Sequence, residues 1–332
     1  MRATSHLTLA ISTLTLSVGC GESEQHQDHS HTPDSPPAAR ICMISNVATD
    51  YAADGSIDTS IRYDYDSDRN LLSSQHDIDG DANTDVRYQY TYDTDGNLLL
   101  EEKTDGDGSL MGRSLYTYDQ HGNLLTNEVR LSDDQLLQRS VYTYDQQGNR
   151  VTAELRNHQD VLATRTSYTY DDDANMLTEA SDSDGDGEVN TMTTYTYDDR
   201  NNRLSSESRD DQGTLISRSD YTYDENNNRL TRQSDRDGDG VVDEIFTTTY
   251  DSNNNRISAE SRDQDGQINR RYSYSYDDQG NLLEAESRDG DNALFNHTSY
   301  SYNDQGNLII EDQDLDGDDA IDRRISYDWL CV

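Results

Sequence analysis

The sequence contains few of the residues from which an apolar core is usually built. Hydrophobic residues make up 31% of the 332 positions, with only 2 Phe and 1 Trp. Lys103 is the single lysine, and all three prolines precede residue 38. We therefore expect no thick apolar core. Because arginine supplies nearly all the positive charge and pairs bidentately with carboxylates, we expect Arg to Asp or Glu ladders across neighbouring strands.

Acidic residues and tyrosine dominate what remains. The formal net charge is -41, and a chain this polar and charged usually stays disordered because it buries too little apolar surface. The 23 tyrosines argue for order, since the tyrosine ring covers apolar surface, its hydroxyl stays hydrated, and tyrosine favours strands. Such a charge repels nucleic acids, so we expect no nucleic-acid partner.

The first residues resemble a bacterial lipoprotein signal. A short basic start, Met1-Arg2, precedes an apolar run over 7–18, which ends in Ser17-Val18-Gly19-Cys20. The resemblance implies that residues 1–19 are removed and that the Cys20 thiol carries the lipid. Because Gly21 follows, it also implies an exported protein that is anchored by this lipid at the outer membrane or cell surface. The alternative is an ordinary secretory signal that is cut nearby.

Residues 20–40 are predicted to be a flexible tether, because they combine all three prolines with small and charged residues. The remaining chain, 41–332, is predicted to be a single repeat domain. Cys42 and Cys331 bracket it, and an exported protein can keep such a pair oxidised. A bridge between them would constrain the unfolded chain by roughly 5 kcal/mol. Two unlinked thiols remain the alternative.

An internal repeat organises this domain. The second tyrosine of a Tyr-x-Tyr-Asp unit recurs every 25 to 27 residues, which indicates a repeat architecture whose units pack on their neighbours. The recurring residues are Tyr65, Tyr92, Tyr118, Tyr144, Tyr170, Tyr197, Tyr223, Tyr250, Tyr276, Tyr302 and Tyr327.

Each unit is predicted to be a β-hairpin. After the Tyr-Asp pair, the fourth turn position is mostly Gly or Asn, as a positive φ requires, although Arg69 and Ala174 are exceptions. The strand over 215–223 alternates with period two, which places Leu215 and Tyr223 on one face and Arg218 on the other. The sequence therefore predicts an all-β fold of about eleven tandem hairpins in a spiral or curled antiparallel sheet. The alternative is a β-propeller with two units in each blade.

The segment Tyr116-Thr117-Tyr118-Asp119-Gln120-His121-Gly122-Asn123-Leu124 resembles the YD-repeat, or Rhs-type, family. The resemblance covers roughly residues 57–328. It implies spiralling β-sheets. In that family such sheets form shells around toxins, or they form stalks and adhesive surfaces.

Four hairpin tips are predicted to bind calcium. Each places oxygen-bearing side chains at positions one, three, five and nine, and this spacing can wrap hard ligands around one Ca²⁺ while glycine permits the sharp turn. The loops resemble those of integrin-type propellers and thrombospondin type 3 repeats. The alternative is a hydrated acidic turn. The predicted ligands are Asp77, Asp79, Asp81 and Asp85; Asp182, Asp184, Asp186 and Asn190; Asp235, Asp237, Asp239 and Asp243; and Asp314, Asp316, Asp318 and Asp322.

The sequence carries no nucleophile elbow, no HExxH motif and no phosphate-binding glycine loop, so we predict that the protein is not an enzyme. The expected function is a calcium-stabilised envelope scaffold for binding or adhesion, whose surface ligand is a polysaccharide or a protein. Two alternatives remain open, namely a carbohydrate-active enzyme on a β-propeller and a shell component of a toxin system. The repeat identifies a scaffold rather than its ligand.

Overall fold

The computed structural model describes residues 42–331. Contacts divide the chain into a unit of residues 1–41 and a second unit that begins at Cys42. The predicted signal, tether and lipidated Cys20 lie outside the described residues.

The described chain is entirely β-structure, as the repeat predicts. It consists of twenty-two strands, so each predicted unit is indeed a hairpin. The strands are β1 Cys42–Asp50, β2 Thr59–Tyr65, β3 Leu71–Asp77, β4 Val86–Tyr92, β5 Leu98–Asp105, β6 Leu110–Tyr118, β7 Leu124–Leu131, β8 Leu136–Tyr144, β9 Arg150–Arg156, β10 Leu162–Tyr170, β11 Met176–Asp182, β12 Thr191–Tyr197, β13 Arg203–Asp210, β14 Leu215–Tyr223, β15 Arg229–Asp235, β16 Glu244–Tyr250, β17 Arg256–Asp263, β18 Ile268–Tyr276, β19 Leu282–Asp289, β20 Leu294–Tyr302, β21 Leu308–Asp314 and β22 Arg323–Cys331.

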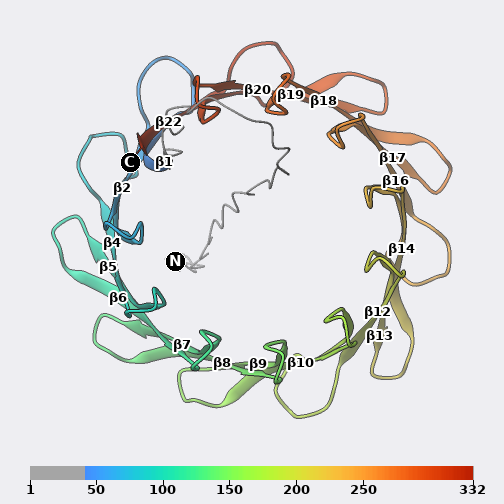
Figure 1. The fold of residues 1–332 in the computed structure, drawn as a ribbon, viewed down its shortest axis with the longest axis horizontal. Helices are drawn as coiled ribbons and strands as arrows, with labels where there is room; N and C mark the ends of the chain where they lie inside the picture. Colours follow the sequence, from blue (N-terminus) through green and yellow to red (C-terminus); the bar gives the residue numbers. More distant parts are fainter. Residues whose placement is uncertain (1–41, 332) are drawn as a thin grey trace, which may run out of the picture. The chain divides into compact units, whose positions relative to one another are not determined.

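The strands form one antiparallel sheet that closes on itself. Each strand pairs with its neighbours in sequence, and β1 pairs with β22 from Cys42 opposite Cys331 to Asp50 opposite Arg324. Figure 1 shows the resulting ring, which is a β-barrel viewed along its axis. The predictions of an open spiral and of a propeller are therefore wrong. A propeller needs separate four-stranded blades, whereas here the hydrogen-bonded ladder continues without interruption from every hairpin to the next.

The seam between the first and last strands is covalent. The structure joins Cys42 and Cys331 by a disulfide with a Cα–Cα distance of 4.0 Å across a sequence separation of 289. The two ends of the repeat region therefore meet in the sheet.

The two faces of the wall differ in composition, as the period-two pattern predicts. In β14, Leu215, Tyr221 and Tyr223 alternate with the more exposed Ile216 and Thr222. The middle threonine or serine of most Tyr-x-Tyr motifs is likewise exposed, whereas the flanking tyrosines are half-buried. One face is thus tyrosine-rich and the other is rich in Thr, Ser, Arg and Glu.

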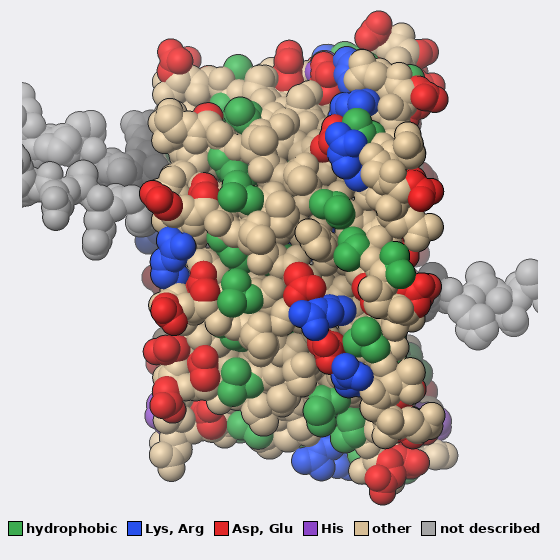
Figure 2. All heavy atoms as spheres, turned by 90° about the vertical axis from the view of Figure 1, so that its right-hand side faces the viewer, with side chains coloured by type: hydrophobic (Ala, Val, Ile, Leu, Met, Phe, Trp, Pro, Cys, Tyr) green, Lys and Arg blue, Asp and Glu red, His purple; other side chains and the backbone are tan. Residues whose placement is uncertain are grey.

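The tyrosine-rich face is the inner face of the ring. Figure 2 shows the outer wall, where the middle of the strands is mostly tan with charged groups, and the hydrophobic colour that includes tyrosine forms separate patches on either side of this middle zone. The outer face is convex, so its side chains spread apart. This agrees with the higher exposure of the threonine positions.

Tyrosine rather than an apolar core connects the hairpins. The second tyrosine of each of ten motifs donates its hydroxyl hydrogen to a backbone carbonyl 20 or 21 residues earlier, as in Tyr223 to Arg203 at 2.9 Å. Small residues such as Ala259 and Ser234 lie buried among the rings of the inner face. Only Val129, Tyr221 and Ala259 are buried hydrophobic residues in the described chain, so ladder hydrogen bonds and tyrosine contacts carry the fold.

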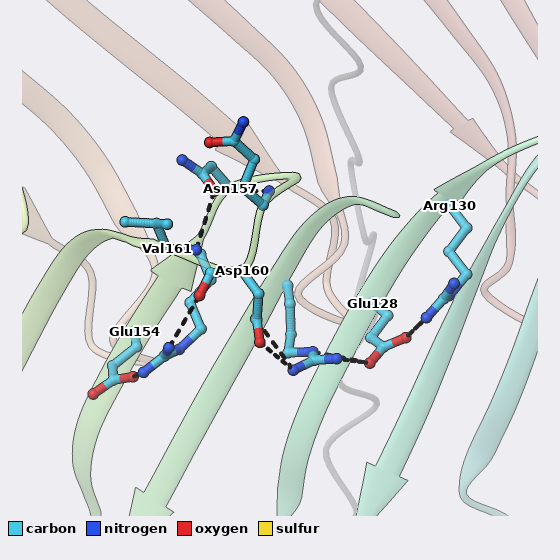
Figure 3. A network of polar contacts seen from close by, with 9 residues as sticks. Glu128, Arg130, Glu154, Asn157, Asp160 and Val161 are labelled. Carbon is cyan, nitrogen blue, oxygen red and sulfur yellow. Dashed lines mark hydrogen bonds and ion pairs between the residues drawn. The ribbon is translucent and has the colours of Figure 1, made fainter. Parts of the chain in front are cut away.

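The outer wall carries the predicted ladders of charge pairs. Glu128 binds Arg130 at 2.6 Å on its own strand and Arg139 at 2.7 Å on the next, and Arg139 also reaches Asp160 at 3.1 Å. Figure 3 shows this network on the outer side of the wall, with strands of the opposite wall behind it. Its arginines hold the pKa of Glu128 below its usual value, and the hydrogen bond from Arg130 is the largest cause.

Residues 42–331 contain no helix that could cross a membrane.

Candidate metal-binding loops and the inner wall

The strands are connected at two rims of the ring. One rim, the turn rim, carries the ten Tyr-Asp turns that begin at Asp66, Asp93, Asp119, Asp145, Asp171, Asp198, Asp224, Asp251, Asp277 and Asn303. The other, the loop rim, carries the eleven hairpin tips that begin at Asp50, Asp77, Asp105, Leu131, Asn157, Asp182, Asp210, Asp235, Asp263, Asp289 and Asp314.

Turns of the turn rim share one geometry, which Asp119 illustrates. Its carboxylate accepts hydrogen bonds from the amides of His121 and Asn123 and from the Asn123 side chain, at 2.8 to 2.9 Å. These bonds, above all that from the Asn123 side chain, hold the pKa of Asp119 below its usual value. The predicted positive φ at the fourth position is confirmed even at the exceptions, since φ is 72° at Arg69 and 64° at Ala174.

The disulfide occupies the place of an eleventh turn. Cys331 ends β22 and Cys42 begins β1, both at the turn rim, where every other pair of consecutive hairpins is joined by a Tyr-Asp turn. The ring is therefore covalently continuous at each position around this rim.

The loop rim brings the predicted calcium ligands together in threes. In each of four loops, three carboxylates place one oxygen each within 4.8 Å of the others. The clusters are Asp77, Asp79 and Asp85; Asp182, Asp184 and Asp186; Asp235, Asp237 and Asp239; and Asp314, Asp316 and Asp322. Oxygen donors gathered at this spacing suit a hard cation such as Ca²⁺.

The first aspartate of each loop is buried and organises the turn. Asp235 is 7% exposed, and its two oxygens accept the amides of Gly238 at 2.7 Å and Gly240 at 2.9 Å. In the equivalent Asp182, burial opposes ionisation, but amide hydrogen bonds led by that from Gly187 outweigh it and keep its pKa below the usual value. The loop amides therefore orient the first aspartate toward the loop interior.

Position nine has a role that the spacing did not predict. The Asp243 side chain accepts the amide of Arg236 at 2.6 Å, and Asn190 likewise accepts the amide of Ser183 at 2.5 Å. Both side chains close their hairpins, and Asp243 lies outside the three-carboxylate cluster of its loop, as do Asp81 and Asp318. Asp85 and Asp322 make the same closing bond and also belong to a cluster.

Sequence reasoning missed a fifth loop of this shape in the first hairpin. Asp50 accepts the amide of Gly55 at 2.7 Å, and the Asp58 side chain accepts the amide of Tyr51 at 2.7 Å, as in the other four. Its third position is Ala52, so the loop lacks one of the carboxylates that form the other clusters. The eight-residue separation of Asp50 and Asp58, equal to that of Asp77 and Asp85, was the available signal.

Glycine at position four of the acidic loops is needed for packing as well as for the turn. Gly238 has a φ of 73°, and a Cβ placed on it would lie 2.2 Å from the Leu215 carbonyl oxygen of the preceding hairpin. The loop thus presses directly on its neighbour's backbone. The remaining six tips close as short turns, for example with the Asp263 amide bonded to the Gln267 carbonyl at 2.9 Å.

Three of the four glutamates that face inward in the described chain lie on strands that are not adjacent in the ring, namely Glu101, Glu179 and Glu311. Tyr195 donates to Glu179 at 3.0 Å and Tyr327 donates to Glu311 at 3.2 Å. Burial, together with these carboxylates, raises the pKa of each tyrosine to about 12. Burial also raises the pKa of Glu101. Because these glutamates lie on β5, β11 and β21, they do not form the close carboxylate pair that glycoside hydrolysis uses.

No family model and no curated protein matches the chain. Among solved structures, the chain is similar to a TcdB2–TccC3–TEV structure at 14% identity with a TM-score of 0.39, covering 85% of this chain and 19% of that one. The Tc holotoxin pore of Photorhabdus luminescens matches at 15% identity and a TM-score of 0.36, covering 80% of this chain and 18% of that one. The chain thus spans about a fifth of these toxin chains.

A porin-like protein from Bacteroides uniformis is also similar, at 12% identity and a TM-score of 0.32, with 86% of this chain and 98% of that chain covered.

Proposed function

We propose that residues 42–331 are a shell-type ring scaffold that holds a guest molecule within its lumen and performs no catalysis. The observation that carries this proposal is the closed ring itself, whose recurring tyrosine-rich face is the inner one. This reading develops the shell alternative rather than adhesion through an open spiral, because a closed sheet has no free edge at which a partner strand could add.

The size of the ring supports a guest. Twenty-two strands spaced about 4.8 Å apart and tilted by about 35° give a backbone diameter of roughly 40 Å, and a side-chain layer of about 5 Å on the inner face leaves a lumen of roughly 30 Å. Among the described residues no large side chain is fully buried, so the inner wall is a solvated surface rather than a packed core.

On the outer wall, by comparison, most charged side chains already bind one another. Most of its arginines have an acidic partner, as in Arg209 to Glu207 at 2.7 Å and Arg288 to Glu286 at 3.0 Å, and several of its threonines bond one another, as in Thr222 to Thr231. Such a surface suits contact with water, whereas the inner wall keeps aromatic and cationic groups available for a ligand.

The proposal includes an exported protein that is tethered by lipid on Cys20. Export fits a ring closed by a disulfide, since disulfides persist in oxidising compartments. We also propose that Ca²⁺ occupies the four acidic loops and stiffens the loop rim. Carboxylate oxygens that are already gathered within 4.8 Å of one another support this assignment.

Photo-crosslinking inside and outside the ring tests the proposed function. p-Benzoylphenylalanine is placed at Tyr300 on the inner face or at the neighbouring Ser301 on the outer face of β20, in cells that make the protein. We expect an adduct of defined mass from Tyr300 and none from Ser301, because the guest contacts the lumen wall.

Adducts from Ser301 alone would overturn the proposal in favour of binding or adhesion at the outer wall. No adduct from either position, with the ring intact on a non-reducing gel, would also contradict it.

A further inference from the structure

The inner residue that begins each returning strand divides the lumen wall into two arcs. On one side of the ring it is arginine at four of five positions, because Met176 begins β11 between the first two of them. The arginines are Arg150, Arg203, Arg229 and Arg256, which begin β9, β13, β15 and β17. It is leucine on the other side, at Leu71, Leu98, Leu124, Leu282 and Leu308. All these positions follow a Tyr-Asp turn, so the arginine arc and the leucine arc lie at the same height beside the turn rim.

Inner tyrosines hold the arginines of the arc in place. The guanidinium of Arg203 lies 4.9 Å from the ring centre of Tyr221, and that of Arg256 lies 4.2 Å from Tyr274. Arg150 lies between Tyr142 and Tyr168, at 5.6 and 5.1 Å. Stacking fixes the plane of a guanidinium while leaving its edge donors available for a partner.

These arginines differ from most arginines of the outer wall in lacking acidic partners. Within residues 42–331, none of the four forms an ion pair, whereas outer arginines such as Arg218 bind both Glu207 and Asp220. Arg150, Arg229 and Arg256 are exposed. The chain therefore leaves cations unneutralised at one inner arc although its net charge is -41.

Nearby carboxylates are already engaged. The inward-facing glutamates nearest the arc are Glu179, which accepts a hydrogen bond from Tyr195, and Glu244, which binds Arg232 and Arg236 at 2.6 Å. The aspartates of the turn rim are bonded within their own turns, as Asp224 is to Asn228 at 2.8 and 2.9 Å. The arc thus remains open to carboxylates from outside the chain.

We propose that the arginine arc binds an acidic, extended segment of a guest polypeptide. This inference rests on the proposed function and adds the chemistry of the guest. A guanidinium edge matches a carboxylate with two parallel hydrogen bonds. Arg203, Arg229 and Arg256 lie on alternate strands, about 10 Å apart, which is close to three residues of an extended chain.

The leucine arc favours a polypeptide over other polyanions. Leu98, Leu124, Leu282 and Leu308 are half-buried and line the wall away from the arginines. A polypeptide offers both carboxylates and aliphatic side chains to such a wall, whereas an acidic polysaccharide or a nucleic acid offers no aliphatic side chains.

Binding of labelled poly-L-glutamate to the purified disulfide-bonded protein, followed by fluorescence anisotropy at about 0.15 M salt, tests the arc. We expect saturable binding. We expect Arg203→Gln with Arg229→Gln to weaken it about tenfold or more, because two charge-assisted contacts are lost. The double variant Arg203→Lys with Arg229→Lys should retain more affinity than the glutamine pair, since it keeps the charge and loses the planar fork.

The matched control is Arg209→Gln with Arg218→Gln, which removes the same charge from the outer wall and should change the affinity by less than about twofold. Thermal melts of each variant confirm folding. Equal weakening by both pairs, or no binding of polyglutamate, would overturn the inference. Tighter binding of polygalacturonate or oligo(dT) than of polyglutamate would overturn it in favour of another polymer.

The two experiments distinguish the acidic character of the guest from the presence of an enclosed guest. Inner-face crosslinks from Tyr300 without polyglutamate binding would leave the enclosed guest in place and reject only its acidic character. Loss of the inner-face crosslinks would reject the enclosed guest itself.

Discussion

The two rims of the ring are built from the same repeat but have different degrees of uniformity. On the turn rim, ten connections share one hydrogen-bonding pattern, and an aspartate or asparagine accepts its own downstream amides each time. On the loop rim, five nine-residue loops alternate irregularly with six short turns. The turn rim therefore repeats one structure, whereas the tips of the loop rim differ in length and in their acidic side chains.

The difference indicates which rim is constrained by the fold. Each turn leads directly into the residue whose carbonyl accepts the next tyrosine hydroxyl, as Arg203 at the start of β13 accepts that of Tyr223, so a changed turn would disturb the contact between hairpins. A tip on the loop rim must only return the chain, and acidic side chains can therefore be added or lost there. The first hairpin, with Ala52 where other loops have aspartate, is such a loss.

The largest expected effect comes from breaking the turn rim at its disulfide. Removal of both cysteines through Cys42→Ser and Cys331→Ser should lower the free energy of unfolding by about 5 kcal/mol, because the unfolded chain gains the entropy of a very long loop. Denaturant unfolding, followed by tyrosine fluorescence, measures this loss.

Reducing agent should lower the stability of the unmodified protein and leave that of the double variant unchanged. Equal stability of the disulfide-bonded protein and the double variant would show that the pairing of β1 with β22 closes the ring without help from the disulfide.

A smaller loss of stability is expected when a side chain is added at a closely packed glycine of the loop rim. Gly238→Ala should lower the free energy of unfolding by about 3 kcal/mol or more. The new Cβ would clash with the Leu215 carbonyl oxygen, and alanine would also have to adopt a left-handed backbone conformation. Gly240→Ala is the control, because its φ of 87° is also left-handed but nothing lies within 4 Å of its Cβ position.

We expect the control to cost only about 1 to 2 kcal/mol in the same thermal melts. Equal costs for the two variants would mean that the loop moves away from its neighbour, contrary to the close packing described above.

The smallest effect sharpens the comparison within the loop rim. Ala52→Asp restores the missing carboxylate of the first loop, so calorimetric titration should change from four calcium ions to five per chain. At a calcium concentration ten times the dissociation constant, the added site should stabilise the fold by about 1.4 kcal/mol. Asp237→Ala, which imitates Ala52 in another loop, should reduce the number to three.

A melting temperature that does not respond to chelator, with no binding heat in either variant, would reject calcium and leave the loops as hydrated acidic turns.

Much of the local structure could be read from single residues. The recurrence of Tyr65 through Tyr327 gives every hairpin, and the alternation in 215–223 gives both faces of the wall, because strand side chains alternate with period two. The positive φ at the fourth turn position follows from the glycines and asparagines found there. The loop that begins at Asp50 was missed because its third position lacks the acidic residue used as the signal.

The candidate site was predicted in part. The four sets of acidic residues are gathered as the spacing suggested, but Asn190 and Asp243 serve to close their hairpins. The arginine arc was not foreseen, since nothing in the sequence around Arg203 or Arg229 states that these residues face a lumen or that they lack an acidic partner.

The sequence by itself determined the repeating unit, its turn, its two faces and its acidic tips, because each depends on interactions within one hairpin or with the next. The tertiary structure alone decided that the eleven hairpins form a ring. Closure requires each hairpin to turn the sheet by roughly 33°, one eleventh of a full circle, and small changes of strand tilt and twist accumulate over the array. No local residue pattern determines this accumulated curvature. The curvature nevertheless decides which face of the sheet points inward and which arginines a guest could reach.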